Sequence, residues 1–271
     1  MGGTKVSGTA DVTITLKDGA GATLDSGSGT LASASGTYNQ AISMDGPVVV
    51  YYKVATVSDV YSSAGGVPIA FDAASLTTTG SKGTSHTWSH TVGAAGTNRI
   101  LIVGTSAESA VAVTNVTYAG QSLTLLGGQS TPGSVTRTEL WYILAPATGT
   151  NNIVVNLGAN KKLAAGAASW TGVHQTATFG TAVFASGTST SPTVDLTSAS
   201  GEVVVDAMAN KSSTSRTEGA NQTLHWSGNS GGKPSSAGSS ESGAATVTMS
   251  WTLGASVEWA IGAVPLKQAS P

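Results

Sequence analysis

The 271-residue chain contains no cysteine. This absence excludes disulfide bonds, thiolate metal sites and a cysteine nucleophile together. The fold must therefore be held by burial of side chains and by backbone hydrogen bonds. The length is sufficient for this, because a chain of roughly 300 residues can bury about three quarters of its unfolded surface.

Charged residues are also scarce. Asp, Glu, Lys and Arg make up 10% of the chain, against about 25% in an ordinary soluble domain. The formal net charge is −2, so the chain lacks the positive field with which a protein collects phosphates, and we expect no nucleic-acid partner. A surface of Ser and Thr in place of Lys and Glu lowers the electrostatic barrier to packing many copies side by side.

Long hydrophobic runs are absent as well. No stretch approaches the roughly 18 apolar residues that a membrane-spanning helix requires, and runs such as Pro47–Tyr52 have the length of a strand. We therefore expect no membrane insertion. No secretory signal is visible after Met1. Either a signal has been removed or the protein leaves the cell without one, as part of a virus particle released by lysis.

Short runs of alternating apolar and small polar residues predict strands almost throughout the chain, and helix patterns are nearly absent. About a dozen closely spaced strands predict an all-β fold, an antiparallel sandwich or jelly roll. The predicted strands are Asp11–Lys17, Tyr38–Met44, Val48–Thr56, His86–Val92, Arg99–Thr105, Val111–Tyr118, Ser122–Leu126, Thr136–Leu144, Asn152–Leu157, Ala164–Trp170, Glu202–Met208, Ala245–Leu253 and Val257–Val264.

Gly65, Gly66 and Pro68 interrupt this pattern. We expect a small β domain at residues 1–66 and a larger antiparallel two-sheet, jelly-roll-like sandwich at residues 67–271. A unit of about 65 residues is marginally stable alone, so the first domain is expected to dock on another protein. Within the second domain, Ala209–Gly243 is rich in Ser, Gly, Asn, Lys and Thr and is predicted to form a long loop.

Several blocks follow one another between Phe71 and Lys267. They are Thr87–Gly93, Asn98–Gly104, Val116–Thr124, Glu139–Thr150 and Thr248–Trp251 with Trp259. In order and spacing they resemble a β-sandwich module that recurs in bacterial extracellular proteins and in phage structural proteins of the decoration, tail and fibre classes. Residues 1–66 resemble small immunoglobulin-type repeats. The resemblance implies a sandwich fold but not a function, since such modules occur in lectin-like, adhesive and structural settings.

His86, Trp88 and His90 lie on one face of a predicted strand. The two histidines cannot share a metal ion, because positions four apart on a strand are about 13 Å apart, whereas zinc–nitrogen bonds are about 2 Å. A metal site would need His174 or His225 from elsewhere in the chain. We expect these residues to be structural, and we expect no metal and no cofactor.

Acids in strand-like contexts are Glu108, Glu139, Glu202, Asp206 and Glu258. Glycoside hydrolysis would need two of them to face each other at about 5 to 10 Å across a cleft. None forms a clustered pair in the sequence, so no catalytic residue is predicted. An enzyme acting on carbohydrate through an unrecognised acid pair remains an alternative.

The tryptophans offer a different kind of site, because an exposed indole can stack on a sugar ring. Trp141, Trp170, Trp251 and Trp259 lie in apolar strands and are expected in the core. Trp226 differs, because it lies in the polar segment beside His225 and Asn229, and these three residues are the candidate glycan contacts. The alternative is that Trp226 pins the predicted loop to the sandwich.

The first hypothesis is a non-enzymatic structural protein of a virion, such as a phage capsid decoration, tail or fibre subunit. It would act as a multimer at the virion surface, with itself or other virion proteins as partners. The alternative is a glycan-binding or adhesive module of a bacterial surface or secreted protein, with cell-surface glycans as partners.

Overall fold

The computed structural model describes residues 10–17, 23–31 and 67–270. The chain divides into two units, Met1–Ala64 and Gly65–Pro271. In the first unit, strands β1 (Ala10–Lys17) and β2 (Thr23–Leu31) pair antiparallel, and β1 confirms the first predicted strand. The predicted strands Tyr38–Met44 and Val48–Thr56 lie outside the described residues. The immunoglobulin-like character and docking role of residues 1–66 stay predictions.

The second unit is built from antiparallel strands, and residues 67–270 contain no helix. This confirms the predicted all-β fold. The strands are β3 (Ala70–Thr78), β4 (Gly83–Val92), β5 (Ile100–Glu108), β6 (Val113–Tyr118), β7 (Gln121–Ser122), β8 (Thr124–Ser130), β9 (Thr136–Leu144), β10 (Gly149–Lys161), β11 (Leu163–Thr171), β12 (Val183–Ser189), β13 (Thr193–Leu196), β14 (Val203–Asn210), β15 (Arg216–Glu218), β16 (Thr223–Asn229), β17 (Ser235–Ser242), β18 (Val247–Leu253) and β19 (Val257–Leu266).

The strand order shows two jelly rolls, one after the other. The first has sheets β3-β11-β5-β9-β8 and β4-β10-β6-β7, and the second has sheets β12-β19-β14-β17-β16 and β13-β18-β15. When β3 is aligned with β12, the strands β11, β5, β9 and β8 correspond in place to β19, β14, β17 and β16. The strands β4, β10 and β6 correspond to β13, β18 and β15. This wrapping of successive strands between two sheets is that of a jelly roll. The predicted jelly-roll-like sandwich is therefore present, and it occurs twice.

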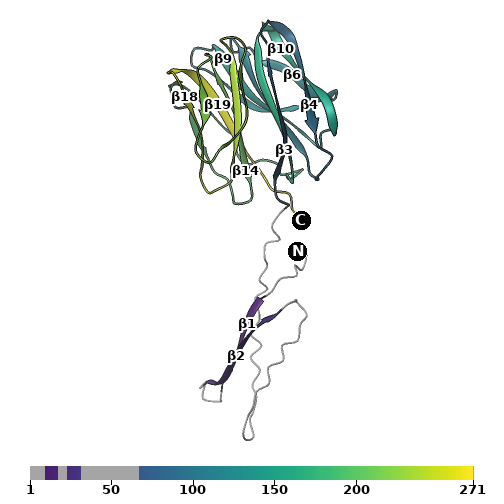
Figure 1. Ribbon diagram of the computed structural model, residues 1–271, viewed down its shortest axis with the longest axis vertical. Coiled ribbons are helices and arrows are strands. Elements are labelled where there is room, and N and C mark those ends of the chain that lie inside the picture. The colour runs from purple at the N-terminus through teal and green to yellow at the C-terminus, as the bar shows by residue number, and fades with distance from the viewer. Residues whose placement is uncertain (1–9, 18–22, 32–66, 271) are drawn as a thin grey trace. The chain divides into compact units, whose positions relative to one another are not determined.

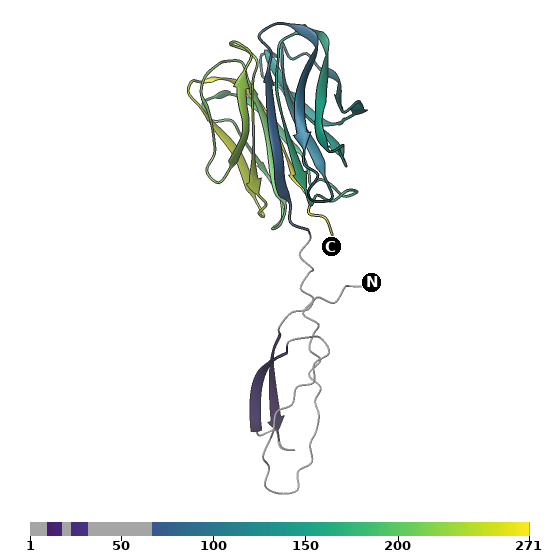
Figure 2. The same cartoon turned by 45° about the vertical axis from the view of Figure 1, so that its right-hand side comes forward.

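The two jelly rolls pack through their five-stranded sheets, so the second unit has four layers of sheet (Figures 1 and 2). Three hydrophobic clusters lie between these layers. On β5, Leu101 and Val103 face the outer cluster of the first jelly roll, while Ile100 and Ile102 face the middle cluster. Because both faces of the two central sheets are covered, β5, β11, β14 and β19 are buried along nearly their whole length.

The middle cluster is built around the indole of Trp226, which is 5% exposed. Three glycines, Gly104 of β5, Gly166 of β11 and Gly238 of β17, lie against this ring. A Cβ atom on Gly166 would be 2.2 Å from the indole, and one on Gly238 would be 2.1 Å from it. The Nε1–H group donates a hydrogen bond to Ser236 Oγ at 3.2 Å. Glycine is therefore required at these positions, because any side chain would occupy the space of the ring.

The prediction of a long loop over Ala209–Gly243 is wrong. This segment contains the end of β14 and the strands β15, β16 and β17. Strand β17 has the sequence SSAGSSES, and its first six residues are buried. It carries small side chains because it runs beneath the large indole of Trp226, so its burial leaves no hydrophobic pattern in the sequence.

Gly166→Ala is expected to destabilise the protein, because the new methyl group overlaps the Trp226 ring in a closely packed core. Overpacking of this kind costs about 1–3 kcal/mol. Urea unfolding at neutral pH measures the loss. Gly80→Ala is the matched control, since a Cβ at Gly80 meets nothing within 4 Å. Equal stability of the two variants would contradict the packing described here.

Candidate functional site

A pocket lies between β3 and β16, the edge strands of the two central sheets. Its volume is about 370 Å³, within the range of about 300–1,000 Å³ that small-molecule sites have. The pocket lies at the seam between the two jelly rolls, so both contribute to its walls. The residues that matter for its chemistry are Phe71, Trp170, Asn221, Leu224, His225 and Glu241.

Each of the two edge strands has a β-bulge at this pocket. On β3, Phe71 pairs with Trp170 and Ala73 with Ser169, so Asp72 is an extra residue. On β16, Leu224 pairs with Ser239 and Trp226 with Gly238, so His225 is an extra residue. A bulge bends its strand and redirects the neighbouring side chains. Adjacent residues of β16 can therefore serve two purposes, with Trp226 in the core and His225 against Phe71.

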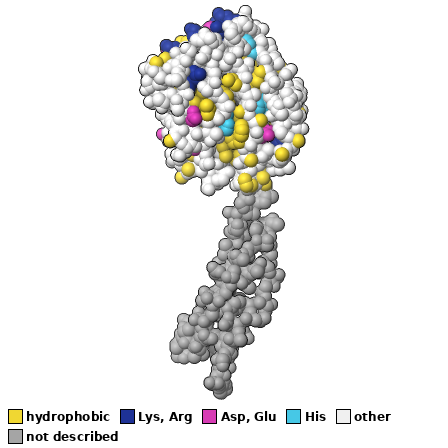
Figure 3. Space-filling model, in the orientation of Figure 1, with side chains coloured by type: hydrophobic (Ala, Val, Ile, Leu, Met, Phe, Trp, Pro, Cys, Tyr) yellow, Lys and Arg dark blue, Asp and Glu magenta, His cyan; other side chains and the backbone are white. Residues whose placement is uncertain are grey.

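Three aromatic rings lie together in the wall of the pocket. Phe71 and His225 stack with centroids 4.5 Å apart, and Trp170 meets both rings edge to face, at 5.2 Å from Phe71 and 5.1 Å from His225. Trp170 is 3% exposed, whereas Phe71 is 46% exposed. The rings of Phe71, Trp170 and His225 thus form an aromatic floor, in which Trp170 is buried and Phe71 is open to solvent. Hydrophobic and histidine side chains lie side by side in the middle of the face in Figure 3.

Burial sets the charge state of the pocket. It lowers the pKa of His225 to about 4, so the ring is neutral at neutral pH, and Nε2 is hydrogen-bonded to Ser240 Oγ at 2.8 Å. It also raises the pKa of the Glu241 carboxyl. No lysine or arginine lines this pocket. The site therefore carries at most one negative charge and offers no cation to an anionic ligand.

The structure separates the three candidate glycan contacts. His225 lines the pocket. Asn229 is the last residue of β16, and its Oδ1 accepts hydrogen bonds from the backbone of Gly231 and Gly232 in the turn that follows. The expectation that Trp226 contacts a glycan needs correction. Its ring is enclosed between the central sheets, so it has no open face for stacking. Glycan binding itself stays a prediction.

Sequence reasoning missed Phe71, the exposed ring of the pocket. It assigned no strand at β3, because the bulge at Asp72 interrupts the alternation of apolar residues. An isolated Phe shortly after Pro68 carries no signal of its own. Trp170 was expected in the core, and it is buried there, but it also forms part of the pocket wall.

The other histidines lie apart from this pocket and from one another. His86 and His90 are buried on one face of β4, as the alternation predicted. His86 Nε2 contacts the Lys161 carbonyl oxygen, and His90 bonds Ser75 and Ser169. His174 Nδ1 accepts hydrogen bonds from backbone amides of its own turn. No group of three or more metal-ligating side chains occurs in the described part of the chain.

The five candidate acids are each engaged in local structure. Glu139 accepts from Arg137 at 2.6 Å and from Trp141 Nε1 at 3.0 Å. Glu258 accepts from Lys211 Nζ and from the Gly133 amide, both at 3.0 Å, and these hydrogen bonds lower its pKa. The remaining contacts are Glu108 with the Lys162 amide, Glu202 with Ser198 and Ala199, and Asp206 with Ser239 and Trp251.

Asp206 lies in the core of the second jelly roll, where burial raises its pKa to about 7 although Trp251 and Ser239 donate hydrogen bonds to it. The folded state thus holds this proton more tightly than the unfolded state. The contribution of Asp206 to stability is therefore full below about pH 4 and is lost as the pH rises through about 7. Burial lowers the pKa values of His90 and His225 to about 4. Their contribution to stability therefore has the opposite pH dependence and rises with pH between about pH 4 and 6.5.

Comparison of the parent protein with the variant Asp206→Asn isolates the contribution of Asp206 to the pH dependence of stability. The variant should be less stable, because an amide nitrogen cannot accept the hydrogen bond from Trp251 Nε1. Its deficit relative to the parent protein should shrink as the pH rises from about 4 to about 7. Urea unfolding across this pH range measures the difference, and the histidine contributions cancel in it. A deficit that is constant with pH would contradict the raised pKa.

No protein-family model matches the chain, and neither a curated protein nor a solved structure matches it. Among the described residues, no helix is long and apolar enough to cross a membrane.

Proposed function

We propose that the chain is a non-enzymatic structural protein of a virus particle, a capsid decoration, tail or fibre subunit, that displays its tandem jelly roll on the particle surface. The observation that carries the proposal is the position of the two ends of the second unit. Val67 and Ala269 form a β-bridge, and the Val67 amide donates to the Ala269 carbonyl oxygen at 2.9 Å. Any segment joined to either end is therefore attached at the same end of the unit.

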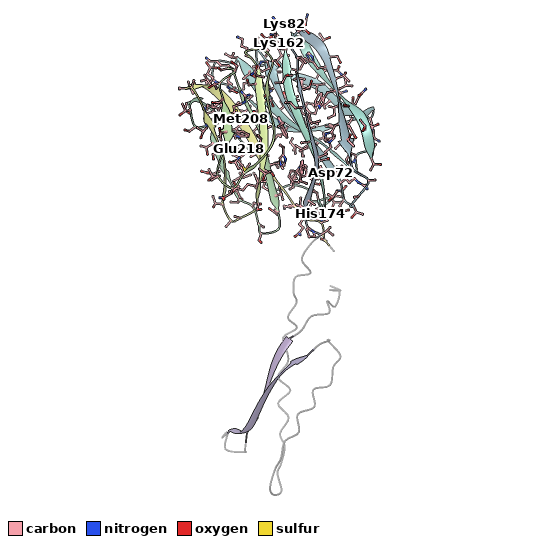
Figure 4. The ribbon with its side chains drawn as sticks, in the orientation of Figure 1. Asp72, Lys82, Lys162, His174, Met208 and Glu218 are labelled. Atoms are coloured by element: carbon pink, nitrogen blue, oxygen red, sulfur yellow. The ribbon has the colours of Figure 1, made fainter. Side chains whose placement is uncertain are left out.

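The opposite end is then free to project. Figure 4 shows Lys82 and Lys162 there, far from His174 at the end that carries Val67 and Ala269. The strands between these ends are held by three hydrophobic cores that lie side by side across the unit, which suits a rigid spacer. The fold is compatible with the proposal without deciding it, because jelly rolls occur in viral capsid proteins and in lectins.

The second candidate is a glycan-binding or adhesive module of a bacterial surface or secreted protein. The pocket at the seam favours it, since an open aromatic ring beside polar side chains is the kind of surface that binds a sugar. The two candidates differ in where the protein is found.

The structural role predicts that the chain is a component of purified particles. Imaging of the source particles, with the two-jelly-roll body fitted to the density, should place it in a repeated, symmetric array. Mass spectrometry of the same particles provides an independent readout. Recovery of the chain only as a soluble monomer, and never with particles, would contradict the proposal.

Docking by residues 1–66 predicts the behaviour of a truncated protein. A chain that begins at Val67 should lose incorporation into particles by at least about tenfold, as expected when an interface worth more than about 1.4 kcal/mol is removed. Its thermal unfolding controls for folding of the remaining unit. Normal incorporation of a folded truncated protein would overturn the docking role.

A further inference from the structure

We propose that the pocket between β3 and β16 binds a neutral saccharide, with a pyranose ring lying on Phe71. This goes beyond the proposed structural role and does not depend on it, because a particle protein and a secreted module could both carry such a site. The inference rests on the two β-bulges, on the aromatic floor and on the polar groups that border it.

The geometry of the rings selects a ligand with one broad apolar face. The ring centroids of Phe71, Trp170 and His225 lie 4.5–5.2 Å apart, so the rings contact one another and leave no space between them for a ligand. They form a continuous floor on which a ligand can lie, and they do not surround it as a cage would. A cage of separated rings is what a quaternary ammonium group would require. The open ring of Phe71, which is 46% exposed, can instead be covered by the apolar C–H face of a sugar.

Polar groups without partners border the same floor. The Nε1–H of Trp170 has no hydrogen-bond acceptor among the described residues, but it has almost no exposed surface, so a ligand on the floor does not reach it. Among residues 67–270, the Glu241 carboxylate and the Asn221 amide have no side-chain or backbone partner either. The Glu241 carboxylate is half-buried and the Asn221 amide is exposed, so a ligand can reach both and form hydrogen bonds with them. Donors and acceptors together match hydroxyl groups, which both donate and accept.

The charges exclude the competing ligand classes. An anionic ligand would meet the Glu241 carboxylate and no lysine or arginine, while His225 is neutral at neutral pH. A wholly apolar ligand would bury Glu241 and Asn221 without supplying hydrogen bonds. A neutral ring with one apolar face and a hydroxyl rim satisfies both the floor and the border.

The test begins with the full chain on a glycan array. The terminal monosaccharide of the strongest hit is then titrated by ligand-observed NMR. We expect binding with a Kd on the order of 1 mM. Phe71→Ala should weaken it by about tenfold or more, since it removes the stacking surface. Leu125→Ala is the matched control: Leu125 is 43% exposed on β8, at the opposite edge of the sheet that contains β3, so the affinity should be unchanged.

Glu241→Gln provides a second variant that leaves the aromatic rings intact, so the test does not depend on folding of Phe71→Ala. It should weaken binding several-fold, because the amide has one acceptor oxygen in place of two. Tetramethylammonium chloride is titrated in parallel as the competing ligand class. The proposal is overturned if no glycan on the array binds, if Phe71→Ala and Glu241→Gln both bind as the parent protein does, or if tetramethylammonium binds at the pocket and sugars do not.

Discussion

The burial of both faces of the two central sheets is the constraint on which the rest of the structure depends. The sheets can approach only because Gly104, Gly166 and Gly238 leave room for the indole of Trp226 between them. Phe184 of β12 makes a similar contact with Gly127 and Gly262. Five of the 35 glycines thus make room for the two aromatic rings at which the jelly rolls pack, in a chain that has no disulfide to hold them.

The pocket is a consequence of the same packing. Its walls come from β3 of one jelly roll and β16 of the other, so neither sandwich could form it alone. Bulges at Asp72 and His225 twist these edge strands where they meet, and bulges also discourage edge-to-edge aggregation. Edge protection and a ligand site can therefore arise from one distortion of the backbone.

Sequence reasoning predicted the parts of the fold in which hydrophobic residues alternate. The predicted strand Thr136–Leu144 coincides with β9, and the buried face of β4 was read from His86, Trp88 and His90. It failed at β3, where a bulge interrupts the pattern, and at β17, where buried residues are Ser, Gly and Ala. The duplication and the pocket were invisible for the same reason: both depend on contacts between strands far apart in sequence, among them Phe71 with His225.

The central claim is that the two jelly rolls form one cooperative body joined by the middle core. Native-state hydrogen exchange tests this most directly, because it reports the free energy of opening for each strand separately. The amides of β5 and β11 in the first jelly roll and of β14 and β19 in the second should exchange with the same free energy, through global unfolding. Exchange of one jelly roll at a clearly lower free energy than the other would show two independent domains and contradict the account.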